Sequence, residues 1–354
     1  MYELNEKIKD LQPYNPTKQE YNIMLNSNES FLRVPEYIFG EAMNALEKIQ
    51  YNRYPDPTAD ELCSAYANFY GLDAENVAAG NGSDELINII CGGFLMSGEK
   101  YATFSLDFSM YSFYAHLAGA VPVVIPQNED FTVDVDKVIK TCQDEKVRML
   151  IFSNPCNPTS IGINKDEVRR IITSLPDTLV VLDEAYMDFW DQSLLDEVAQ
   201  YDNLIILKTL SKAFGLAGLR CGFAIANKKL TDVIKAIKSP FNVNSMTQAF
   251  ATTILKHKAE SKCACRQLVQ STSELQEALE GLSEKYPGTI TVIKSNTNFV
   301  TVKMKNAADA FVYFREHGII IRFFGSFIRI TAGNHSENTQ LVKFFDSFLE
   351  ENAE

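Results

Sequence analysis

The chain has 354 residues, a formal net charge of −13, 46% hydrophobic residues and 22% charged residues. Such a composition is typical of a globular protein and allows one large domain or two of ordinary size. The acidic balance argues against nucleic-acid binding, because neutralising phosphates requires a basic face. No apolar run approaches the roughly 18 residues of a membrane helix, and the start "MYELNEKIKDLQ" has no signal-peptide core. These features predict a cytoplasmic location without a membrane or nucleic-acid partner.

Cysteine and histidine content limits the chemistry available to side chains. The seven cysteines are scattered, and only Cys263 and Cys265 lie close together, which predicts reduced thiols. The four histidines form no H-x-x-x-H or Cys/His grouping, which argues against a zinc site. With so few histidines, difficult chemistry is better assigned to an organic cofactor, and no metal is expected.

In chain order, the N-terminal segment 1–29 has no place in the predicted sheet and is expected to pack with a smaller C-terminal domain. Residues 30–244 are expected to form the large domain, in which short β-branched strands alternate with amphipathic helices. This alternation over about 25–30 residues predicts right-handed βαβ units and a mostly parallel sheet. The clearest strands are predicted at 148–153, 178–185 and 203–209, and the helices between them at 164–175 and 193–201.

The rhythm changes after about residue 245, so residues 245–354 are expected to form the smaller α+β domain. A long helix is indicated by Leu268, Leu275, Leu279 and Leu282. Further strands and helices follow to the end of the chain, with strands predicted at 289–293, 298–304, 319–322 and 327–331, a helix ending near Gly318, and a closing helix that carries Leu341, Phe344, Phe345 and Phe348.

Two polar residues follow neighbouring strands of the predicted sheet. Asp183 ends the strand that begins near 178, and Lys212 lies just beyond the strand at 203–209. Taken alone, Asp183 fits a helix N-cap or a turn, and Lys212 fits an exposed turn. Because the carboxyl ends of parallel strands carry the ligand site, both residues are expected at one edge of the sheet. Lys208, at the end of "LIILK", is interpreted as a strand-end lysine whose replacement has little effect.

A carboxylate and an amine at this edge fit the needs of pyridoxal phosphate. Its aldehyde must bond a lysine, and a carboxylate must keep its pyridine nitrogen protonated. Its phosphate requires backbone N–H groups and a cation. The stretch "GNGSDE" supplies Gly82 and then Ser83, which opens a predicted helix whose N-terminus suits an anion. Arg220 supplies the cation, and Ser211 supplies a hydroxyl donor.

Other interpretations of these motifs remain open. "GNGSDE" also resembles the dinucleotide-binding fingerprint, although it lacks the third glycine of G-x-G-x-x-G. The two Asn-Pro steps of "SNPCNPTS" form a rigid turn, or else fix Asn157 against the phenolic oxygen of the cofactor ring. Phe108 of "LDFSMY" either packs in the core or stacks on that ring.

With these motifs in place, the chain resembles the pyridoxal-phosphate-dependent aminotransferases of fold type I, and most closely their histidinol-phosphate aminotransferase branch. The resemblance implies an α/β fold with a mostly parallel seven-stranded sheet flanked by helices in the large domain, plus the smaller α+β domain. It also implies a homodimer. The motifs run nearly end to end: "LNSNES" at 25–30, "NRYPDP" at 52–57, "GNGSDE", "SNPCNPTS", "LDEAYMDF", "TLSKAFGLAGLRCGF", "KSPFNVNS" at 238–245 and "IRITAG" at 328–333.

The resemblance also implies roles around the cofactor ring. Lys212 becomes the Schiff-base lysine, and Asp183 the partner of the pyridinium nitrogen. Tyr186 and Asn157 would hydrogen-bond the O3′ oxygen, and Phe108 would stack on the ring. The phosphate would be held by Gly82, Ser83, Ser211 and Arg220, and Asp84 is a further cofactor-binding position.

Further positions correspond to the substrate pocket of this family. Arg329 of "FIRIT" matches the arginine that anchors the anionic group of the substrate, and Arg322 is the expected second cation. Asn28 lies in the matching N-terminal segment. Tyr54 resembles a residue that reaches the cofactor phosphate and substrate pocket of the neighbouring subunit.

The sequence departs from the family pattern at a few positions. Ser160 stands where glycine is usual, Cys156 where asparagine is frequent, and "LNSNES" lacks the usual following proline. None of these changes removes a cofactor contact, but they loosen the substrate assignment. The reaction implied is amino transfer from histidinol phosphate to 2-oxoglutarate. An aromatic aminotransferase and a threonine-phosphate decarboxylase remain alternatives, as does a non-catalytic binding module, against which the presence of both Lys212 and Asp183 argues.

Overall fold

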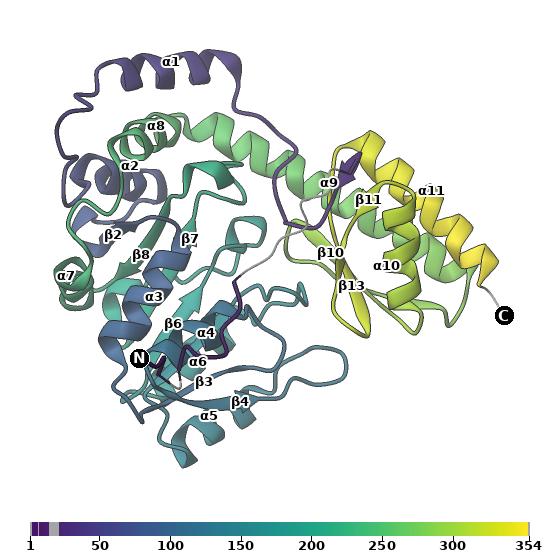
Figure 1. Cartoon of the computed structure of the whole chain (residues 1–354), viewed down its shortest axis with the longest axis horizontal. Coiled ribbons are helices and arrows are strands. Elements are labelled where there is room, and N and C mark those ends of the chain that lie inside the picture. Colours follow the sequence, from purple (N-terminus) through teal and green to yellow (C-terminus); the bar gives the residue numbers. More distant parts are fainter. Residues whose placement is uncertain (1, 6, 14–20, 353–354) are drawn as a thin grey trace.

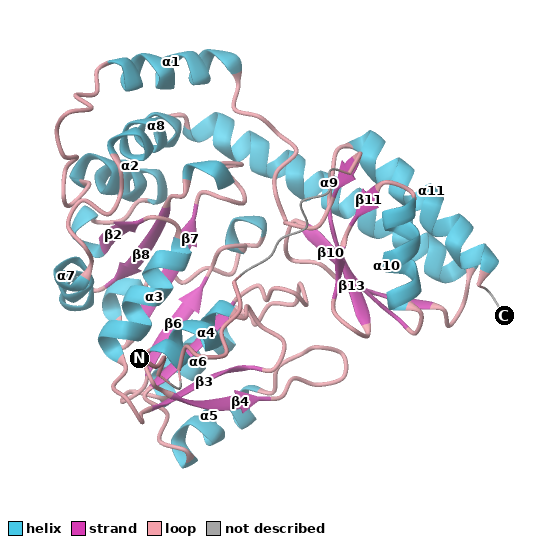
Figure 2. Ribbon diagram, viewed as in Figure 1, coloured by secondary structure: helices cyan, strands magenta, loops and turns pink. Residues whose placement is uncertain are grey.

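The computed structural model describes residues 2–5, 7–13 and 21–352. A seven-stranded sheet is the centre of the larger part of the molecule (Figure 2). Strand β8 runs antiparallel to both of its neighbours, and the other adjacent pairs are parallel, as predicted. The strand order is β2 (Val77–Gly80), β8 (Gly222–Ala226), β7 (Leu204–Thr209), β6 (Leu179–Asp183), β5 (Met149–Ser153), β3 (Lys100–Phe104) and β4 (Val121–Ile125).

Helices cover both faces of this sheet (Figure 1). Their apolar stripes and the buried strands form two cores, one on each face. One core receives side chains from α3 (Ser83–Phe94), α4 (Met110–Leu117) and α7 (Lys228–Ile237). The other receives side chains from α2 (Asp60–Tyr70), α5 (Val135–Asp144), α6 (Lys165–Ser174) and α8 (Ser245–Lys256), and α1 (Glu36–Glu47) packs on α8.

Asparagine caps show why several helices begin where they do. Asn164, Asn227 and Asn244 precede α6, α7 and α8, and each side chain accepts a hydrogen bond from a backbone N–H of the first turn. Asn334 does the same for α11 (His335–Glu351), where Glu337 completes a capping box. Each cap satisfies a backbone donor that the helix itself leaves unpaired.

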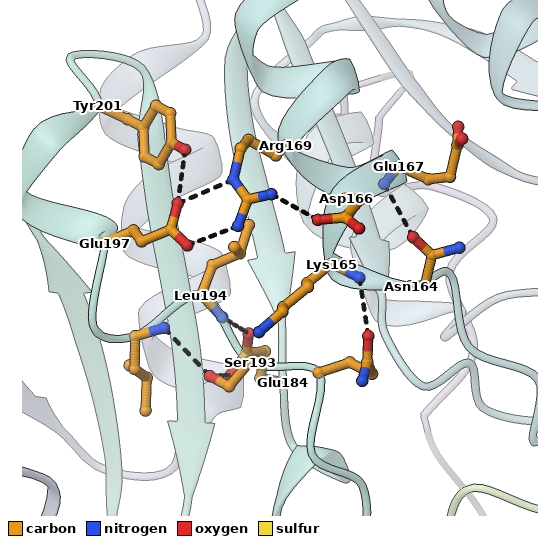
Figure 3. A network of polar contacts seen from close by, with 12 residues as sticks. Asn164, Lys165, Asp166, Glu167, Arg169, Glu184, Ser193, Leu194, Glu197 and Tyr201 are labelled. Atoms are coloured by element: carbon orange, nitrogen blue, oxygen red, sulfur yellow. Dashed lines mark hydrogen bonds and ion pairs between the residues drawn. The ribbon is translucent and has the colours of Figure 1, made fainter.

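The helix predicted at 193–201 is wrong. Only a 3₁₀ turn at Val198–Gln200 forms there. Glu184 accepts hydrogen bonds from the Ser193 hydroxyl (2.6 Å) and the Leu194 N–H (3.3 Å), which fixes a turn instead. Arg169 of α6 then holds Glu197 through two nitrogens, at 3.0 and 2.6 Å (Figure 3). The bond between the Leu194 N–H and the Glu184 side chain competes with helix formation, because it uses a backbone donor that a helix would need.

The C-terminal part has its own antiparallel sheet, ordered β12 (Arg322–Phe323), β13 (Phe327–Thr331), β10 (Phe299–Met304) and β9 (Ile290–Ile293). The long helix α9 (Lys258–Lys285) leads into it (Figure 1), and α10 (Ala307–Glu316) and α11 pack against it. These elements agree with those predicted after residue 245.

The N-terminal segment contains one short strand that the sequence did not indicate, β1 (Ile23–Met24), which pairs with β11 (Ile319–Ile320). Ile23 and Leu25 are buried in the core of the C-terminal part. Part of the predicted segment 1–29 lies outside the described residues. The domain boundaries at 29/30 and 244/245 stay predictions. Helix α8 begins just after the second boundary, and its buried apolar residues pack in the core of the larger sheet.

Lys208 lies near the end of β7, as the sequence suggested, but it is buried. Its side chain is 2% exposed and lies 3.2 Å from Asp188 Oδ1 and 3.9 Å from Glu184 Oε2. The side chain lies on the same face of β7 as Ile206, two residues earlier, which belongs to the core that α2, α5, α6 and α8 form with the sheet. Burial raises the pKa of Glu184 to about 7, and the charge of Lys208 opposes that rise.

We therefore expect Lys208→Ala to destabilise the protein strongly rather than to be silent. Removing one partner of a buried ion pair leaves uncompensated carboxylates and costs about 3–5 kcal/mol. Denaturant unfolding of the cofactor-free protein measures the change. Lys228→Ala is the matched control, because its ion pair with Asp232 is more than half exposed and contributes below about 1 kcal/mol. Equal stabilities for the two variants would contradict this expectation.

Candidate active site

The carboxyl edge of the larger sheet opens into a cavity of about 420 Å³. Loops that follow β2, β3, β5, β6 and β7 contribute to its wall, and the C-terminal part and residues 26–29 close it from the other side. This is the edge at which open α/β sheets bind ligands. The cavity brings together these predicted residues: Asn28, Ser83, Asp84, Phe108, Asn157, Asp183, Tyr186, Ser211, Lys212, Arg220, Arg322 and Arg329.

Asp183 is the buried acid of the cavity, with 4% of its surface exposed. Its carboxylate accepts hydrogen bonds from the Tyr111 hydroxyl (2.7 Å) and the Ala185 N–H (3.0 Å). Burial raises the pKa of Asp183 to about 6, and the hydrogen bond from Tyr111 limits the rise. A buried carboxylate of this kind is stabilised by a cation in the cavity, such as a protonated pyridine nitrogen.

Lys212 is the only lysine among the described residues that line the cavity. Its Nζ donates to the carbonyl of Ser27 at 3.1 Å and lies 5.7 Å from the centre of the Tyr186 ring. No carboxylate pairs with it in the described part of the chain. The amine is therefore held in place by a neutral acceptor, which leaves it available for bonding to an aldehyde.

At the phosphate site predicted around "GNGSDE", two glycines allow the backbone and an arginine to come close together. Gly82 has φ +82°, and a Cβ at this position would stand 2.7 Å from Arg220 Nη2. Likewise, a Cβ at Gly222 would stand 2.4 Å from the backbone N of Ser83. Glycine is thus required for close approach of the arginine and of the N-terminus of α3. Arg220 also contacts Asp84 at 3.1 Å.

Ser211 also lines this part of the cavity. It is buried, and its Oγ accepts a hydrogen bond from Thr209 Oγ1 at 3.0 Å, which leaves its own hydroxyl proton to donate. Helix N–H groups, a guanidinium and hydroxyls form a donor set that suits a phosphate dianion. The residues present therefore fit pyridoxal 5′-phosphate, with Asp183 for its ring nitrogen and Lys212 for its aldehyde.

Tyr186 and Asn28 form the third side of the cavity. The Asn28 amide donates to the Tyr186 hydroxyl at 2.8 Å, and its Oδ1 accepts from Thr331 at 3.1 Å. Asn28 has φ +54°, a conformation that asparagine adopts more readily than most residues. Phe108 contacts Tyr111 edge to face, with 5.6 Å between ring centres.

Arg329 is a buried cation that lacks a carboxylate partner in the described part of the chain. It is 6% exposed, donates through Nη1 to Asn157 Oδ1, and donates through Nη2 to the Asn26 carbonyl at 2.7 Å. Its Nε is buried without any hydrogen-bond partner among the described residues. Burial lowers the pKa of Arg329 to about 10, and Arg322 acts in the same direction. Such an arginine is suited to an anion that arrives with the substrate.

Tyr54 is the predicted residue that lies away from this cavity. Its side chain is 83% exposed and stacks on Phe241 at 4.7 Å between ring centres. A residue that serves the site of a neighbouring subunit has to lie outside its own, so this position is compatible with the predicted role, which stays a prediction.

Sequence reasoning missed several cavity residues, above all Asp107, Tyr111 and Ser153. Ser153 pairs in register with Asp183 on the neighbouring strand, so its position at the end of "RMLIFS" was an available signal. Tyr111 lies within α4 and is fully buried, which in a sequence suggests core packing alone.

The departures from the family pattern have local explanations. Ser160 has φ +65°, the region that glycine occupies easily, and its hydroxyl donates to the Thr159 carbonyl at 2.6 Å. Cys156 is buried and its thiol donates to the Leu106 carbonyl at 3.1 Å. In the described part of the chain, no group of His, Cys, Asp or Glu side chains is arranged to hold a metal ion. None of its helices has the length and apolar character needed to cross a membrane.

Comparison with known proteins identifies the class. A family model described as "Aminotransferase class I and II" matches residues 22–345. The chain therefore belongs to the class I and II aminotransferases. This membership confirms the predicted fold, the predicted aminotransferase activity and pyridoxal 5′-phosphate as the predicted cofactor. An enzyme of this class uses an amino donor and a 2-oxo acid.

Within that class the chain is similar to histidinol-phosphate aminotransferases. It is 36% identical over 349 residues to the enzyme of Clostridium kluyveri, covering 97% of this chain and 98% of the relative. It is 38% identical over 351 residues to the enzyme of Pyrococcus furiosus, covering 98% of both chains. The crystal structure of histidinol-phosphate aminotransferase from Sinorhizobium meliloti, in complex with pyridoxal-5′-phosphate, has a TM-score of 0.89 at 22% identity and covers 100% of this chain and 99% of that one.

Proposed function

We propose that this protein transfers the amino group of histidinol phosphate to 2-oxoglutarate, giving imidazole acetol phosphate and glutamate in histidine biosynthesis. The observation that carries the proposal is Arg329, a buried guanidinium without a carboxylate partner in the described residues, in the same cavity as Lys212 and Asp183. The full-length similarity to histidinol-phosphate aminotransferases supports the choice of substrate. A cytoplasmic location is part of the proposal.

The residues of the cavity divide the work of such a reaction. Bound pyridoxal phosphate supplies a ring that withdraws electrons from the α-carbon of the amino donor. Asp183 keeps the proton on the pyridine nitrogen, and Lys212 Nζ moves a proton to and from that α-carbon. Tyr186 and Asn157 orient the ring through its phenolic oxygen. Arg220, Ser211 and the N-terminus of α3 hold the phosphate.

Arg329 and Arg322 would then receive the anionic ends of both substrates. A phosphate dianion and a carboxylate each fit the fork of a guanidinium, so one pocket can serve the two half-reactions. The Nε of Arg329, which has no hydrogen-bond partner in the described part of the chain, supports this role, because a buried donor without a partner is costly until a ligand satisfies it.

A homodimer is the second part of the proposal. Tyr54 and Phe241 stack at the surface, away from the cavity of their own chain. In the proposed dimer Tyr54 reaches the cofactor phosphate and substrate pocket of the partner subunit. Sedimentation analysis tests the assembly, and a monomer with full activity would contradict it.

We expect Arg329→Lys to impair both half-reactions without changing the spectrum of the bound cofactor. Losing one charge-assisted contact in a dry site costs about 2–4 kcal/mol, roughly 30- to 1000-fold in kcat/KM. Steady-state kinetics of Arg329→Lys in each half-reaction measure this loss.

The identity of the substrate is tested with a panel of histidinol phosphate, histidinol, phenylalanine and threonine phosphate, each with 2-oxoglutarate. Histidinol should be far poorer than its phosphate. Faster turnover of phenylalanine would favour the aromatic aminotransferase, and release of CO₂ from threonine phosphate would favour the decarboxylase.

A further inference from the structure

A second acidic side chain, Asp107, lines the cavity and has no part in the chemistry described so far. It follows β3 and precedes Phe108. Its carboxylate accepts from the Phe108 N–H (2.8 Å), from the Ser153 N–H (3.1 Å) and from the Ser153 hydroxyl. Because these partners are all donors, the carboxylate is occupied as an acceptor and is poorly placed to act as a base.

The contacts of Ser153 extend this arrangement to the substrate arginine. A hydroxyl has one proton to donate and lone pairs to accept with. Ser153 donates its proton to Asp107 and accepts the Asn157 N–H at 3.1 Å. Asn157 in turn accepts from Arg329 Nη1 through its side chain. Hydrogen bonds therefore link Asp107 to Ser153, Ser153 to the backbone N–H of Asn157, and the side chain of Asn157 to Arg329.

The environment of Asp107 makes a charged residue costly at this position. Asp183 of β6, Tyr111 of α4 and Cys156 of the loop after β5 all lie near it, and none of them is a cation. Burial raises the pKa of Asp107 to about 7, against the hydrogen bonds from Ser153 and Phe108. The donors therefore offset a real desolvation cost, which a residue that only filled space would not incur.

We propose that Asp107 is a positioning residue that acts through Ser153 to fix Asn157 and, with it, the guanidinium of Arg329. The inference rests on the proposed function, since it is there that Arg329 receives the anionic group of the substrate. Asp107 thereby sets the affinity for the substrate anion, without touching it.

The test uses the cofactor-loaded enzyme and glutarate, an unreactive dicarboxylate with the carbon chain of 2-oxoglutarate. In Asp107→Asn one carboxylate oxygen becomes an NH2 group that faces a Ser153 donor, either its N–H or its hydroxyl, so at least one of the hydrogen bonds that hold Ser153 is lost. We expect glutarate to bind about tenfold more weakly and the KM for 2-oxoglutarate to rise equally, with kcat changed less than about threefold. Cofactor affinity, measured by titrating the cofactor-free protein, should stay within about threefold of wild type.

Two further variants make the test specific. Ser153→Ala removes the second link and should weaken glutarate binding similarly, and Asp107→Asn should add less than about twofold in that background. Asp130→Asn is the matched control. Asp130 likewise accepts a backbone N–H (3.0 Å) and a hydroxyl (2.6 Å), both from Thr132, but it is not among the cavity residues. This control should bind glutarate as wild type does.

The possible outcomes separate this inference from the function on which it rests. If Arg329→Lys loses glutarate and Asp107→Asn does not, the positioning role is wrong and the anchoring role stands. If Arg329→Lys binds glutarate normally, the anchoring role itself is wrong. Parallel loss of cofactor and glutarate in Asp107→Asn, or fully additive effects with Ser153→Ala, would also overturn the positioning role. Should Asp107→Asn fail to fold, normal glutarate binding by Ser153→Ala alone would overturn it.

Discussion

Lys212→Ala is expected to abolish turnover while leaving the protein folded. Lys212 is the only lysine among the described residues of the cavity, and its Nζ is held by the neutral carbonyl of Ser27. Replacing it removes both the amine that bonds the cofactor aldehyde and the group that moves the α-proton. Proton transfer alone contributes about 10²–10⁴-fold, so we expect a loss of at least about 10³-fold.

The measurement combines a steady-state assay with the visible absorption of the protein after addition of pyridoxal phosphate. The band of the lysine-linked cofactor should be missing in Lys212→Ala, and the unfolding transition should be close to that of wild type. Lys229→Ala, an exposed lysine near the start of α7, serves as the control and should keep both band and activity. Transamination at the wild-type rate by Lys212→Ala would refute the central assignment.

The position of Asp183 and Lys212 was predictable because it depends on topology. Parallel strands end at one edge of a sheet, so polar residues just beyond adjacent strands must come together. The observed register, which pairs Ser153 with Asp183 and Asp183 with Leu207, bears this out. Motif resemblance then supplied roles that topology alone does not give.

Contacts between distant segments were not predictable in the same way. The Tyr111 hydroxyl donates to Asp183, which lies 72 positions further along the chain. Within its own helix, Tyr111 is only a buried aromatic residue, and nothing there indicates this contact. Lys208 was interpreted as a strand-end lysine whose replacement has little effect, whereas its side chain is buried beside Asp188 and on the same face of β7 as Ile206 of the core. Only the packed structure shows that Asp188 and Glu184 meet it there.

Arg329 illustrates a limit of periodicity. The strand "FIRIT" is buried on both faces, so alternation cannot reveal on which side the arginine lies. Its assignment came from the family resemblance. The structure adds the cavity, the aromatic rings of Phe299 and Phe324 beside it, and an Nε without a hydrogen-bond partner among the described residues. Asp107 stands beside Phe108 in "LDFSMY", but that stretch predicted a role for Phe108 alone, and the hydrogen bonds to Ser153 are what distinguish Asp107.

Asp183→Asn is expected to bind cofactor but to turn over at least about 10²-fold more slowly. A neutral amide cannot keep the proton on the pyridine nitrogen, so the ring withdraws electrons poorly from the α-carbon. In the variant the amide oxygen can take the place of Oδ1 and accept the Ala185 N–H, and the amide nitrogen can then donate to the Tyr111 hydroxyl, which preserves the local structure. Steady-state kinetics and cofactor titration measure the two effects, and a loss of only a few-fold would mean that another group protonates the nitrogen.

The same variant changes how the stability of the cofactor-free protein depends on pH. Burial raises the pKa of Asp183 from 3.8 to about 6 in the folded chain, so between these values the folded state binds a proton that the unfolded state does not. Stability from this group is therefore greatest at low pH and is lost as pH rises through about 6, by up to roughly 3 kcal/mol. Asp183→Asn removes this dependence and also removes a charge that helps to raise the pKa of Asp107, which acts in the same direction, while Glu184 contributes equally to both proteins. The free energy of unfolding of wild type minus that of the variant should therefore fall between pH 4 and pH 7, and a difference that rises or stays flat would show that Asp183 is ionised in the folded protein without cofactor.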